Sequence, residues 1–502
     1  MFFEPQGLCE MKCEMNQDKG TSCHCLLCLC FWKRFPYSSV VSAQRMFVFT
    51  LCLYFWCWLS SIHGLEFRYH NSMEMEQYLK DINRRFPDIT LLHSIGQSVE
   101  GRELWVLILG QHPREHRTGI PEFKYVGNMH GNEAVGRVLL LQLIDYLTSS
   151  YLSDPLVTRL LNSSRVHILP SMNPDGFESS ARECMNIKGR YNKNGVDLNR
   201  NFPDAFESTT DREREKEVRA VMDWLKTENF VLSANLHGGA VVASYPYDNS
   251  NGGSELQGGL SISPDDDVFV HLAKTYSYRH SEMHNGNGCY DSQDFSHGIT
   301  NGYQWYPLPG GMQDYNYMWA QCFELTLEIS CCKYPPEAQL PGLWAANKPA
   351  LLAYMQQVHL GVKGVVMDSY GKPVQNAVVE VSGRRNVCPF RTDRNGEYYR
   401  LLLPGNYTIK VMYPGHKTLT QTVQVPYGPD AFSALTHNFL LQNSDYSSTA
   451  TQVPQFCTTP DLGIQESDSA PLLPIQKRRN CVDAQQSIGC RVVRYCNNVV
   501  TW

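Results

Sequence analysis

Helical and strand-like patterns of apolar residues alternate along residues 65–359. Residues 73–86 carry Met75, Leu79 and Ile82 at the spacing of an amphipathic helix, and residues 104–109 (LWVLIL) form a short apolar run typical of a buried strand. Further strand-like runs lead into the polar segments HGNEAVGR, NPDG and HGG. This alternation predicts an α/β domain with one large sheet between helices, in which ligands bind where strands end.

The pattern changes after residue 359. Segments such as GVVMD, VVEVSG and TIKVMYPG alternate apolar and polar residues and are separated by turn residues. They predict a small antiparallel β-sandwich over residues 360–442. Residues 443–502 are rich in Ser, Thr, Pro and Asp and then become basic, so we expect a largely disordered tail.

A targeting signal stands near the N-terminus. The apolar run MFVFTLCLYFWCWLSSI follows Arg45 and leads into small residues, which is the pattern of a secretory signal peptide. We therefore assign residues 46–64 to a signal peptide and residues 1–45 to an atypical extension. An uncleaved signal-anchor helix is the alternative, because the run is only slightly shorter than a membrane span.

Sequons and cysteines agree with export to an extracellular location, either secreted or at the cell surface. Asn162 and Asn406 both stand in Asn-x-Ser/Thr sequons. An oxidising compartment would let some cysteines pair, although the sequence does not choose the connectivity. A zinc–thiolate site is a weak rival, because no CxxC pair occurs among the cysteines concerned. These are Cys184, Cys289, Cys322, Cys331, Cys332 and Cys388.

The charge balance argues against nucleic acid as a partner. The 502 residues carry a formal net charge of −6 with 19% charged residues. Binding of phosphates needs a concentrated basic surface, which this composition does not supply.

The segment HGNEAVG places His130 and Glu133 three residues apart between a strand and a helix. Hydrolytic zinc sites take three protein ligands and leave a position for water, so a third ligand is expected elsewhere. His237, which ends the strand-like VLSANL before two glycines, is the best candidate. An isolated His-x-x-Glu pair is common by chance. His112 and His116 also have metal-like spacing, but we expect them to be solvated in a polar loop.

Candidates for proton transfer lie in the apolar segment FELTLEIS. Glu324 and Glu328 are an even number of residues apart and therefore share one face of the predicted strand. Metal-assisted hydrolysis needs a carboxylate that accepts a proton from water and returns it to the leaving amine. Burying carboxylates in such a strand is costly, so at least one is expected to be functional, but periodicity does not separate them.

The segment GRYNKNGVDLNRNF brings Arg190, Asn199 and Arg200 together. An Arg fork matches a carboxylate bidentately and Asn adds neutral donors, which is what an exopeptidase needs for a C-terminal carboxylate and a tetrahedral oxyanion. Each residue alone is equally compatible with a polar surface loop. The set favours an exopeptidase.

Six ordered motifs resemble those of the regulatory metallocarboxypeptidases of the N/E subfamily: HGNEAVGR, MNPDGFE, DLNRNFPDAF, ANLHGGAVVASYPYDN, GYQWYPLPGGMQDYNY and FELTLEISCCKYPP. The resemblance covers about residues 65–441. It implies an α/β catalytic domain with a large mixed sheet, followed by a small transthyretin-like all-β sandwich. It also implies one Zn²⁺ per chain and release of C-terminal Lys or Arg from peptides and proteins such as kinins and anaphylatoxins.

The resemblance also implies residue roles. His130, Glu133 and His237 match the zinc ligands, and Glu328 rather than Glu324 matches the general acid/base. Arg190 matches the residue that steadies the scissile carbonyl and its oxyanion. The remaining positions match residues that bind substrate: Asn199 and Arg200 as the carboxylate clamp, Tyr306 as a mobile tyrosine over the substrate, and Asp248 and Gln321 as the acidic and polar residues of a pocket for a basic side chain.

The resemblance has two further implications, one for a disulfide and one for a membrane anchor. Cys289 and Cys332 resemble a family disulfide pair. A glycolipid anchor signal would end in a hydrophobic tail of about 10–20 residues, whereas residues 474–502 show no comparable run. Membrane association through a lipid anchor is therefore not supported by this C-terminus.

Two other functions compete with an active exopeptidase. A catalytically inactive relative that only binds peptides or matrix proteins would lack a zinc ligand or the general base, yet this sequence retains His130, Glu133, His237 and Glu328. A zinc endopeptidase would have no use for the Asn199–Arg200 clamp on a free carboxylate. Both alternatives are therefore disfavoured.

Overall fold

The computed structural model describes residues 64–207, 213–252, 256–257, 259–289, 294–426, 434–444, 492–495 and 498–501. The predicted extension, all of the predicted signal peptide except Gly64, and most of the predicted tail lie outside these residues. Within the described residues, no helix is both long and apolar enough to cross a membrane.

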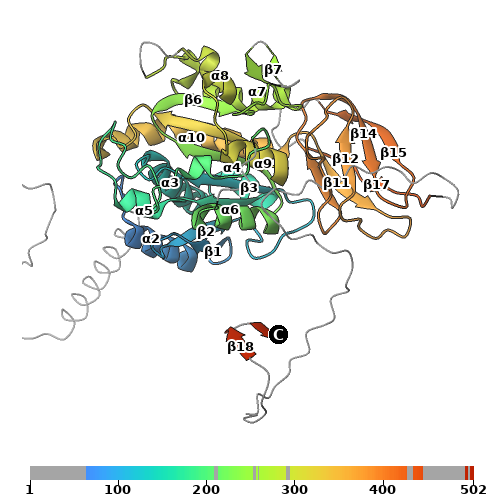
Figure 1. Cartoon of the computed structure of the whole chain (residues 1–502), viewed down its shortest axis with the longest axis horizontal. Coiled ribbons are helices and arrows are strands. Elements are labelled where there is room, and N and C mark those ends of the chain that lie inside the picture. The colour runs from blue at the N-terminus through green and yellow to red at the C-terminus, as the bar shows by residue number, and fades with distance from the viewer. Residues whose placement is uncertain are drawn as a thin grey trace, which may run out of the picture. The chain divides into compact units, whose positions relative to one another are not determined.

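A mixed sheet of eight strands forms the frame of the larger domain (Figure 1). Strands β3, β4, β5 and β10 run parallel to their neighbours within this group, whereas β1, β2 and β6 pair antiparallel with β2, β4 and β10. In sheet order the strands are β1 (Thr90–Gln97), β2 (Glu103–Leu109), β4 (Arg165–Leu169), β3 (Glu122–Gly127), β5 (Phe230–His237), β10 (Phe323–Ser330), β6 (Ala240–Tyr245) and β9 (Ile299–Asn301). The predicted α/β architecture with a large mixed sheet is confirmed.

Helices cover both faces of this sheet. Consecutive residues of a strand point to opposite faces, and in β3 the Tyr125 hydroxyl donates to the carbonyl of Leu351 in α10, whereas Val126 packs in one apolar cluster with Trp224 of α6. The α-helices are α2 (Ser72–Arg85), α3 (Val135–Ser150), α4 (Pro155–Ser163), α5 (Pro174–Glu178), α6 (Lys216–Thr227), α7 (Asp266–Arg279), α8 (Gly302–Trp305), α9 (Met312–Ala320) and α10 (Leu340–Gln356).

The local sequence explains where helix α2 begins and which face it buries. Asn71 accepts a hydrogen bond from the backbone of Glu74, and Glu74 returns one to the backbone of Asn71, which is a capping box that starts the helix. The residues that suggested a helix over 73–86 are those that it buries, namely Met75, Leu79 and Ile82.

The second domain is a sandwich of two sheets around a core of Val, Ile, Tyr and Phe side chains. One sheet contains β11 (Val362–Met367), β13 (Glu397–Arg400), β16 (Leu435–Thr436) and β17 (Phe439–Leu440), and the other contains β12 (Val378–Val381), β14 (Gly405–Met412) and β15 (Leu419–Val425). Within the tail, the structure describes one antiparallel pair, β18 (Val492–Tyr495) and β19 (Asn498–Thr501). The predicted all-β sandwich is confirmed.

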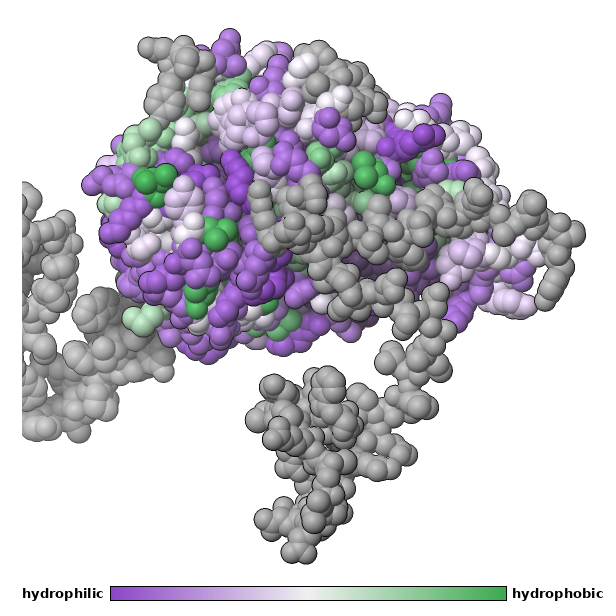
Figure 2. Space-filling view, viewed as in Figure 1, coloured by the Kyte–Doolittle hydropathy of each residue, from purple (hydrophilic) through white to green (hydrophobic). Residues whose placement is uncertain are grey.

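The face of the molecule seen in Figure 2 is mainly hydrophilic, with hydrophobic residues scattered singly. Isolated apolar residues are ordinary on a protein surface. Most large apolar side chains of the described residues are instead buried in the cores of the two domains.

A buried ion-pair network joins the two domains at Asp265, which precedes α7 and is fully buried. Its carboxylate accepts hydrogen bonds from Arg384 Nη1 and Arg400 Nη2, both at 3.0 Å, and from Asn386 Nδ2 at 3.2 Å. These three donors come from the sandwich, and the Tyr317 hydroxyl of α9 adds a bond of 2.7 Å. The sandwich thus supplies most of the donors to a buried charge of the catalytic domain.

His116 makes a second contact between the domains and is not solvated, so that prediction is wrong. Its Nδ1 lies 2.7 Å from Glu122 of β3 and its Nε2 lies 2.6 Å from Glu397 of β13. Burial alone would lower the pKa of His116, but the two carboxylates outweigh burial and raise this pKa to about 10. The imidazolium therefore stays charged at neutral pH. His112, by contrast, is exposed as expected.

Replacing Asp265 should destabilise the protein strongly. Asp265→Ala leaves the buried guanidinium of Arg400 uncompensated, a change that costs about 3–5 kcal/mol. Asp267→Ala is the matched control, because it removes a half-exposed partner of Arg384 and should cost no more than about 1 kcal/mol. Differential scanning calorimetry would measure both. Equal shifts in melting temperature would contradict the importance of the buried network.

Candidate active site

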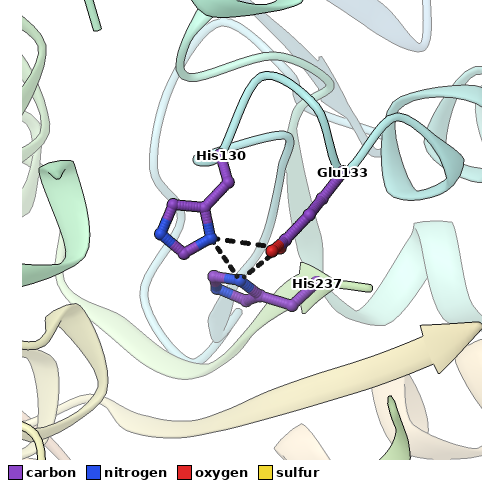
Figure 3. A group of neighbouring side chains, drawn as sticks. All are labelled: His130, Glu133 and His237. Atoms are coloured by element: carbon purple, nitrogen blue, oxygen red, sulfur yellow. Dashed lines mark hydrogen bonds and ion pairs between the residues drawn. The ribbon is translucent and has the colours of Figure 1, made fainter. Parts of the chain in front are cut away.

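Three buried side chains converge on one point at the edge of the sheet (Figure 3). His130 and Glu133 lie in the loop between β3 and α3, and His237 is the last residue of β5. Glu133 Oε2 lies 3.1 Å from His130 Nδ1 and 2.8 Å from His237 Nδ1, and the two Nδ1 atoms are 3.2 Å apart. The sequence prediction that these residues meet is therefore correct in geometry.

The donor atoms of this triad suit a zinc ion. His130 Nε2 lies 2.9 Å from Asp197 Oδ1, so its N–H is held by the carboxylate and the lone pair of Nδ1 faces the other two residues. Two imidazole nitrogens and one carboxylate oxygen are a common ligand set of catalytic zinc. Burial raises the pKa of Asp197, but the hydrogen bond and charge of His130 outweigh it and hold this pKa below its usual range.

The loop of the triad is shaped by Asn128 and Gly131. Asn128 has a positive φ of 56°, and its Nδ2 donates to the carbonyls of His130 and Gly131 at 2.9 and 3.0 Å. A Cβ on Gly131 would lie only 2.1 Å from the carbonyl carbon of Gly176. The asparagine and the glycine therefore allow the chain to turn sharply enough for His130 and Glu133 to face one point.

Glu328 lies beside the triad because β10 pairs in parallel with β5, with Glu328 opposite His237. Its Oε2 is buried and has no hydrogen-bond partner among the described residues. Burial, aided by the negative charge of Glu133, raises the pKa of Glu328 to about 7. A carboxyl group whose pKa is near neutral suits a general acid/base.

Glu324, on the same face of β10, has a different environment. Its Oε2 lies 2.8 Å from Lys124 Nζ and accepts a hydrogen bond of 2.6 Å from Ser233 Oγ. The lysine and the glutamate are both fully buried. Glu324 is therefore half of a structural ion pair inside the sheet, and the environments separate two glutamates that periodicity left equivalent.

The predicted oxyanion residue Arg190 and the predicted carboxylate clamp, Asn199 and Arg200, line the same cavity as the triad. Arg190 is oriented by Asp197, whose Oδ2 accepts from Nε at 3.1 Å and from Nη2 at 2.9 Å. Asn199 and Arg200 lie in a single 3-10 turn (Leu198–Arg200), in which Arg200 Nη1 donates to the Asn199 carbonyl. Two guanidinium groups therefore reach one cavity.

Asp248 lines the same cavity and is buried. Its Oδ1 accepts a 2.8 Å hydrogen bond from Gln313 Nε2. A Cβ on Gly302 would lie 1.8 Å from this Oδ1, so glycine is required for the close approach. Burial raises the pKa of Asp248 to about 7, against the lowering effect of Arg200 and with the repulsion of Glu324.

The prediction that Gln321 belongs to this pocket is wrong. Gln321 ends α9 in a left-handed conformation, with φ 57°, and its Oε1 accepts from the backbone N–H of Arg391 in the sandwich at 2.5 Å. Gln313, in the first turn of the same helix, contacts Asp248 instead. Eight residues of helix span about 12 Å, so the two glutamines cannot exchange places. Gln313 stands in GYQWYPLPGGMQDYNY, the same motif as Tyr306, and this shared motif could have pointed to Gln313 in the sequence.

Tyr306 directly follows α8 and is 41% exposed. Its ring lies edge-on against Trp305, with centroids 5.0 Å apart, and both aromatic residues line the cavity. Burial of the hydroxyl and the nearby charge of Glu328 raise the pKa of Tyr306. The partly exposed tyrosine therefore stands at the rim as a neutral phenol.

Two disulfides fasten the segment that follows β10. Cys184 pairs with Cys332 and Cys289 pairs with Cys331. The predicted Cys289–Cys332 pair is therefore wrong: the adjacent cysteines 331 and 332 bind different partners, and Cys332 takes Cys184 at a Cα–Cα distance of 4.5 Å. Cys322 is buried and unpaired.

Comparisons with known proteins agree with this geometry. The model of the zinc carboxypeptidase family matches residues 75–350, which is more than half of the chain. The chain belongs to this family. A carboxypeptidase regulatory-like domain matches residues 361–437. The predicted zinc metallocarboxypeptidase is thereby confirmed.

Similarity to individual proteins identifies the subfamily within this family. The chain is 57% identical to mouse (Mus musculus) carboxypeptidase M over 387 residues, covering 76% of this chain and 86% of the relative. It is 45% identical to the human (Homo sapiens) carboxypeptidase N catalytic chain, covering 72% and 83%. It is also 45% identical to carboxypeptidase D of Anas platyrhynchos, of which it spans only 28%. The chain is thus a member of the regulatory N/E subfamily, near carboxypeptidase M.

Proposed function

We propose that this chain hydrolyses the last peptide bond of peptides and proteins and releases C-terminal Lys or Arg, with one Zn²⁺ per chain bound by His130, Glu133 and His237. The observation that carries the proposal is the buried carboxylate of Asp248 in the same cavity as the triad. The similarity to carboxypeptidases M and N supports it.

Glu328 and Arg190 are proposed to carry the chemistry. Zinc, when bound, activates water and polarises the scissile carbonyl. Glu328 accepts a proton from the attacking water and returns it to the leaving amine, for which its raised pKa is suited. The guanidinium of Arg190, oriented by Asp197, donates to the oxygen of the carbonyl as negative charge develops there.

Asn199 and Arg200 are proposed to bind the terminal carboxylate, which makes the enzyme an exopeptidase. A free carboxylate pairs with a guanidinium through charge-assisted hydrogen bonds, whereas an internal peptide bond offers no such group. Tyr306 is proposed to close over the bound substrate, since it stands at the rim and is partly exposed.

Asp248 is proposed to select Lys and Arg side chains. A basic side chain would neutralise the buried carboxylate, whereas an apolar side chain would leave its charge without a cationic partner. Gln313, which does not line the cavity, is proposed to act behind Asp248, because its amide holds that carboxylate in place. Pairing with a cation would lower the pKa of Asp248 and favour its ionised form.

We assign the catalytic domain to residues 65–359 and the sandwich to residues 360–442, which the matched family ranges support. We also propose an extracellular location, secreted or at the cell surface, in line with the signal-peptide pattern of residues 46–64. Kinins, anaphylatoxins and similar peptides ending in Lys or Arg are the proposed substrates.

A panel of four peptides tests the activity. Peptides ending in Arg and Lys should lose that residue, while one ending in Phe and one ending in Arg-amide should stay intact, because the pocket and clamp require a cation and a free carboxylate. A zinc chelator should abolish release. Mass spectrometry measures the products. Preferential release of Phe would refute the pocket assignment, and cleavage of the amide would refute exopeptidase action.

Glu328→Gln should lower kcat by about 10²–10⁴-fold and leave zinc bound, because it removes the proton acceptor only. In the parent enzyme, kcat/KM should fall as pH drops and the base becomes protonated. The pKa of Glu328 near 7 sets the upper limit of this acidic limb, since the charge of bound zinc moves it lower. Loss of zinc from the variant, measured by atomic absorption, would show that Glu328 is structural.

The two glutamines give a matched pair. Gln313→Ala removes a hydrogen bond to Asp248 and should raise KM for a peptide ending in Arg by about 10-fold. Gln321→Ala should leave KM unchanged, because that side chain contacts the sandwich. Steady-state kinetics on one peptide compares them. A larger effect at Gln321 would reverse the assignment.

A further inference from the structure

We propose that Lys333 is a positioning residue for the zinc ligand Glu133: its ammonium group fixes the carboxylate oxygen that does not face the histidines. Lys333 follows the two disulfide cysteines at the end of β10 and lines the cavity. This inference rests on the proposed zinc site of His130, Glu133 and His237.

The two oxygens of Glu133 have different surroundings. Oε2 faces His130 Nδ1 and His237 Nδ1 and accepts from the backbone N–H of Gly238 at 3.2 Å. Oε1 lies 2.6 Å from Lys333 Nζ. One oxygen is therefore directed to the metal position, and the other is anchored by a cation.

Arg190 is a second cation near Oε1, but it is a weaker partner. Its Nη1 lies 3.3 Å from Glu133 Oε1, and its Nε and Nη2 are both bound to Asp197. Among the described residues, Nη1 makes only long contacts, 3.3 Å to Glu133 Oε1 and 3.4 Å to His130 Nδ1. Because Lys333 balances the charge of Glu133, we infer that Nη1 can turn from them to the substrate carbonyl. In this proposal Lys333 positions the metal ligand Glu133, and Arg190 binds the oxyanion.

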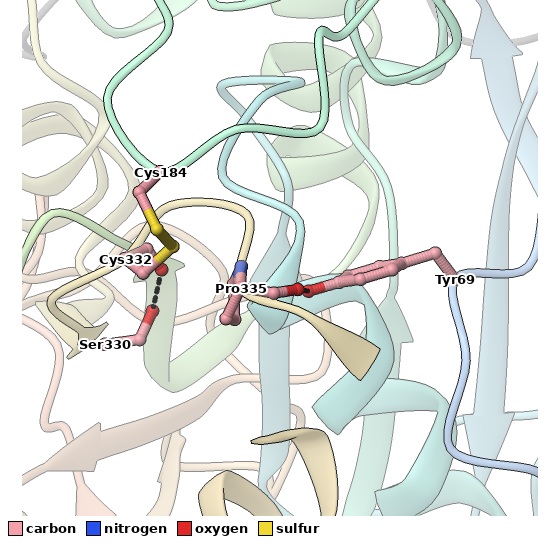
Figure 4. Close-up of a disulfide and its surroundings, with 5 residues drawn as sticks. All are labelled: Tyr69, Cys184, Ser330, Cys332 and Pro335. Carbon is pink, nitrogen blue, oxygen red and sulfur yellow. Dashed lines mark hydrogen bonds between the residues drawn. A yellow bond between two sulfur atoms is a disulfide. The ribbon is translucent and has the colours of Figure 1, made fainter. Parts of the chain in front are cut away.

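The backbone around Lys333 is fixed at several points, which gives its side chain a defined origin. The Cys184–Cys332 and Cys289–Cys331 disulfides precede it, and its carbonyl accepts from the backbone N–H of Ala134, next to Glu133. Figure 4 shows the Cys184–Cys332 bridge with two further anchors: Ser330 Oγ donates to the Cys332 carbonyl at 2.8 Å, and Tyr69 Oη donates to the Pro335 carbonyl at 2.7 Å.

Gly239 leaves the space through which the lysine reaches Glu133. A Cβ at Gly239 would lie 3.0 Å from Lys333 Cε and 3.4 Å from Nζ, and the residue has φ +120°, which disfavours any side chain. The second glycine of the HGG segment is thus explained by the passage of Lys333.

Two opposing effects of Lys333 on zinc affinity can be weighed. Its positive charge repels a metal cation, but the ammonium is partly exposed, with 23% of the side chain accessible, so solvent screens this repulsion. In metal sites generally, mutation of a residue that orients a metal ligand lowers metal affinity by about 10–100-fold. Orientation therefore outweighs repulsion, and removal of Lys333 should weaken binding.

The test measures zinc affinity of the full chain by competition with a chromophoric chelator. Lys333→Met should bind zinc about 10–100-fold more weakly, and Lys333→Arg, which keeps the cation, should restore most of the affinity. Lys226→Met is the matched control, because Lys226 also contacts a carboxylate, Asp223 at 2.8 Å, but on the surface of α6. Its zinc affinity should equal that of the parent.

His237→Ala distinguishes failure of this inference from failure of the proposed function. If the parent does not bind zinc, or if His237→Ala binds it equally well, the zinc site itself is wrong. If His237→Ala loses zinc while Lys333→Met binds as tightly as the parent or more tightly, only the role of Lys333 is refuted. Should Lys333→Met fail to fold, the neutral Lys333→Gln variant is measured in its place, with the same outcomes.

Discussion

In the central sheet, β5 and β10 run parallel in a register that sets His237 opposite Glu328. β3 lies on the other side of β5 and ends at the same edge, just before the loop of His130 and Glu133. Three parallel strands therefore bring the three proposed metal ligands and the proposed base to one place without help from long loops. Everything else in the site is arranged around this edge, in keeping with ligand binding where parallel strands end.

Charge is distributed unevenly over the carboxylates of the site. Asp197 is paired with Arg190 and His130, and Glu133 with Lys333 and the histidines. Glu328 has no comparable ion pair among the described residues, and burial together with the negative charge of Glu133 raises its pKa. The same protein interior therefore holds ionised anchors beside Glu328, whose carboxyl group can exchange a proton near neutral pH.

Sequence motifs predicted those parts of the site that depend on the ends of strands. His130, Glu133 and His237 meet as expected because His237 ends β5 and the other two stand in the short loop that follows β3. Periodicity could not separate Glu324 from Glu328, since only the tertiary partner Lys124 distinguishes them. The wrong predictions for Gln321 and for the Cys289–Cys332 pair concern segments in which residues close in the sequence contact different parts of the structure. The left-handed turn at the end of α9 directs Gln321 to the sandwich, and adjacent Cys331 and Cys332 bind different partners.

The network at Asp265 bears on whether the catalytic domain can be produced without the sandwich. A catalytic domain without the sandwich would keep the buried carboxylate of Asp265 but lose Arg384, Arg400 and Asn386, leaving Tyr317 as its remaining side-chain donor in the network described above. An unbalanced buried charge is costly. The sandwich therefore contributes to the stability of the catalytic domain, and a fragment truncated at the domain boundary is expected to be less stable than the full chain.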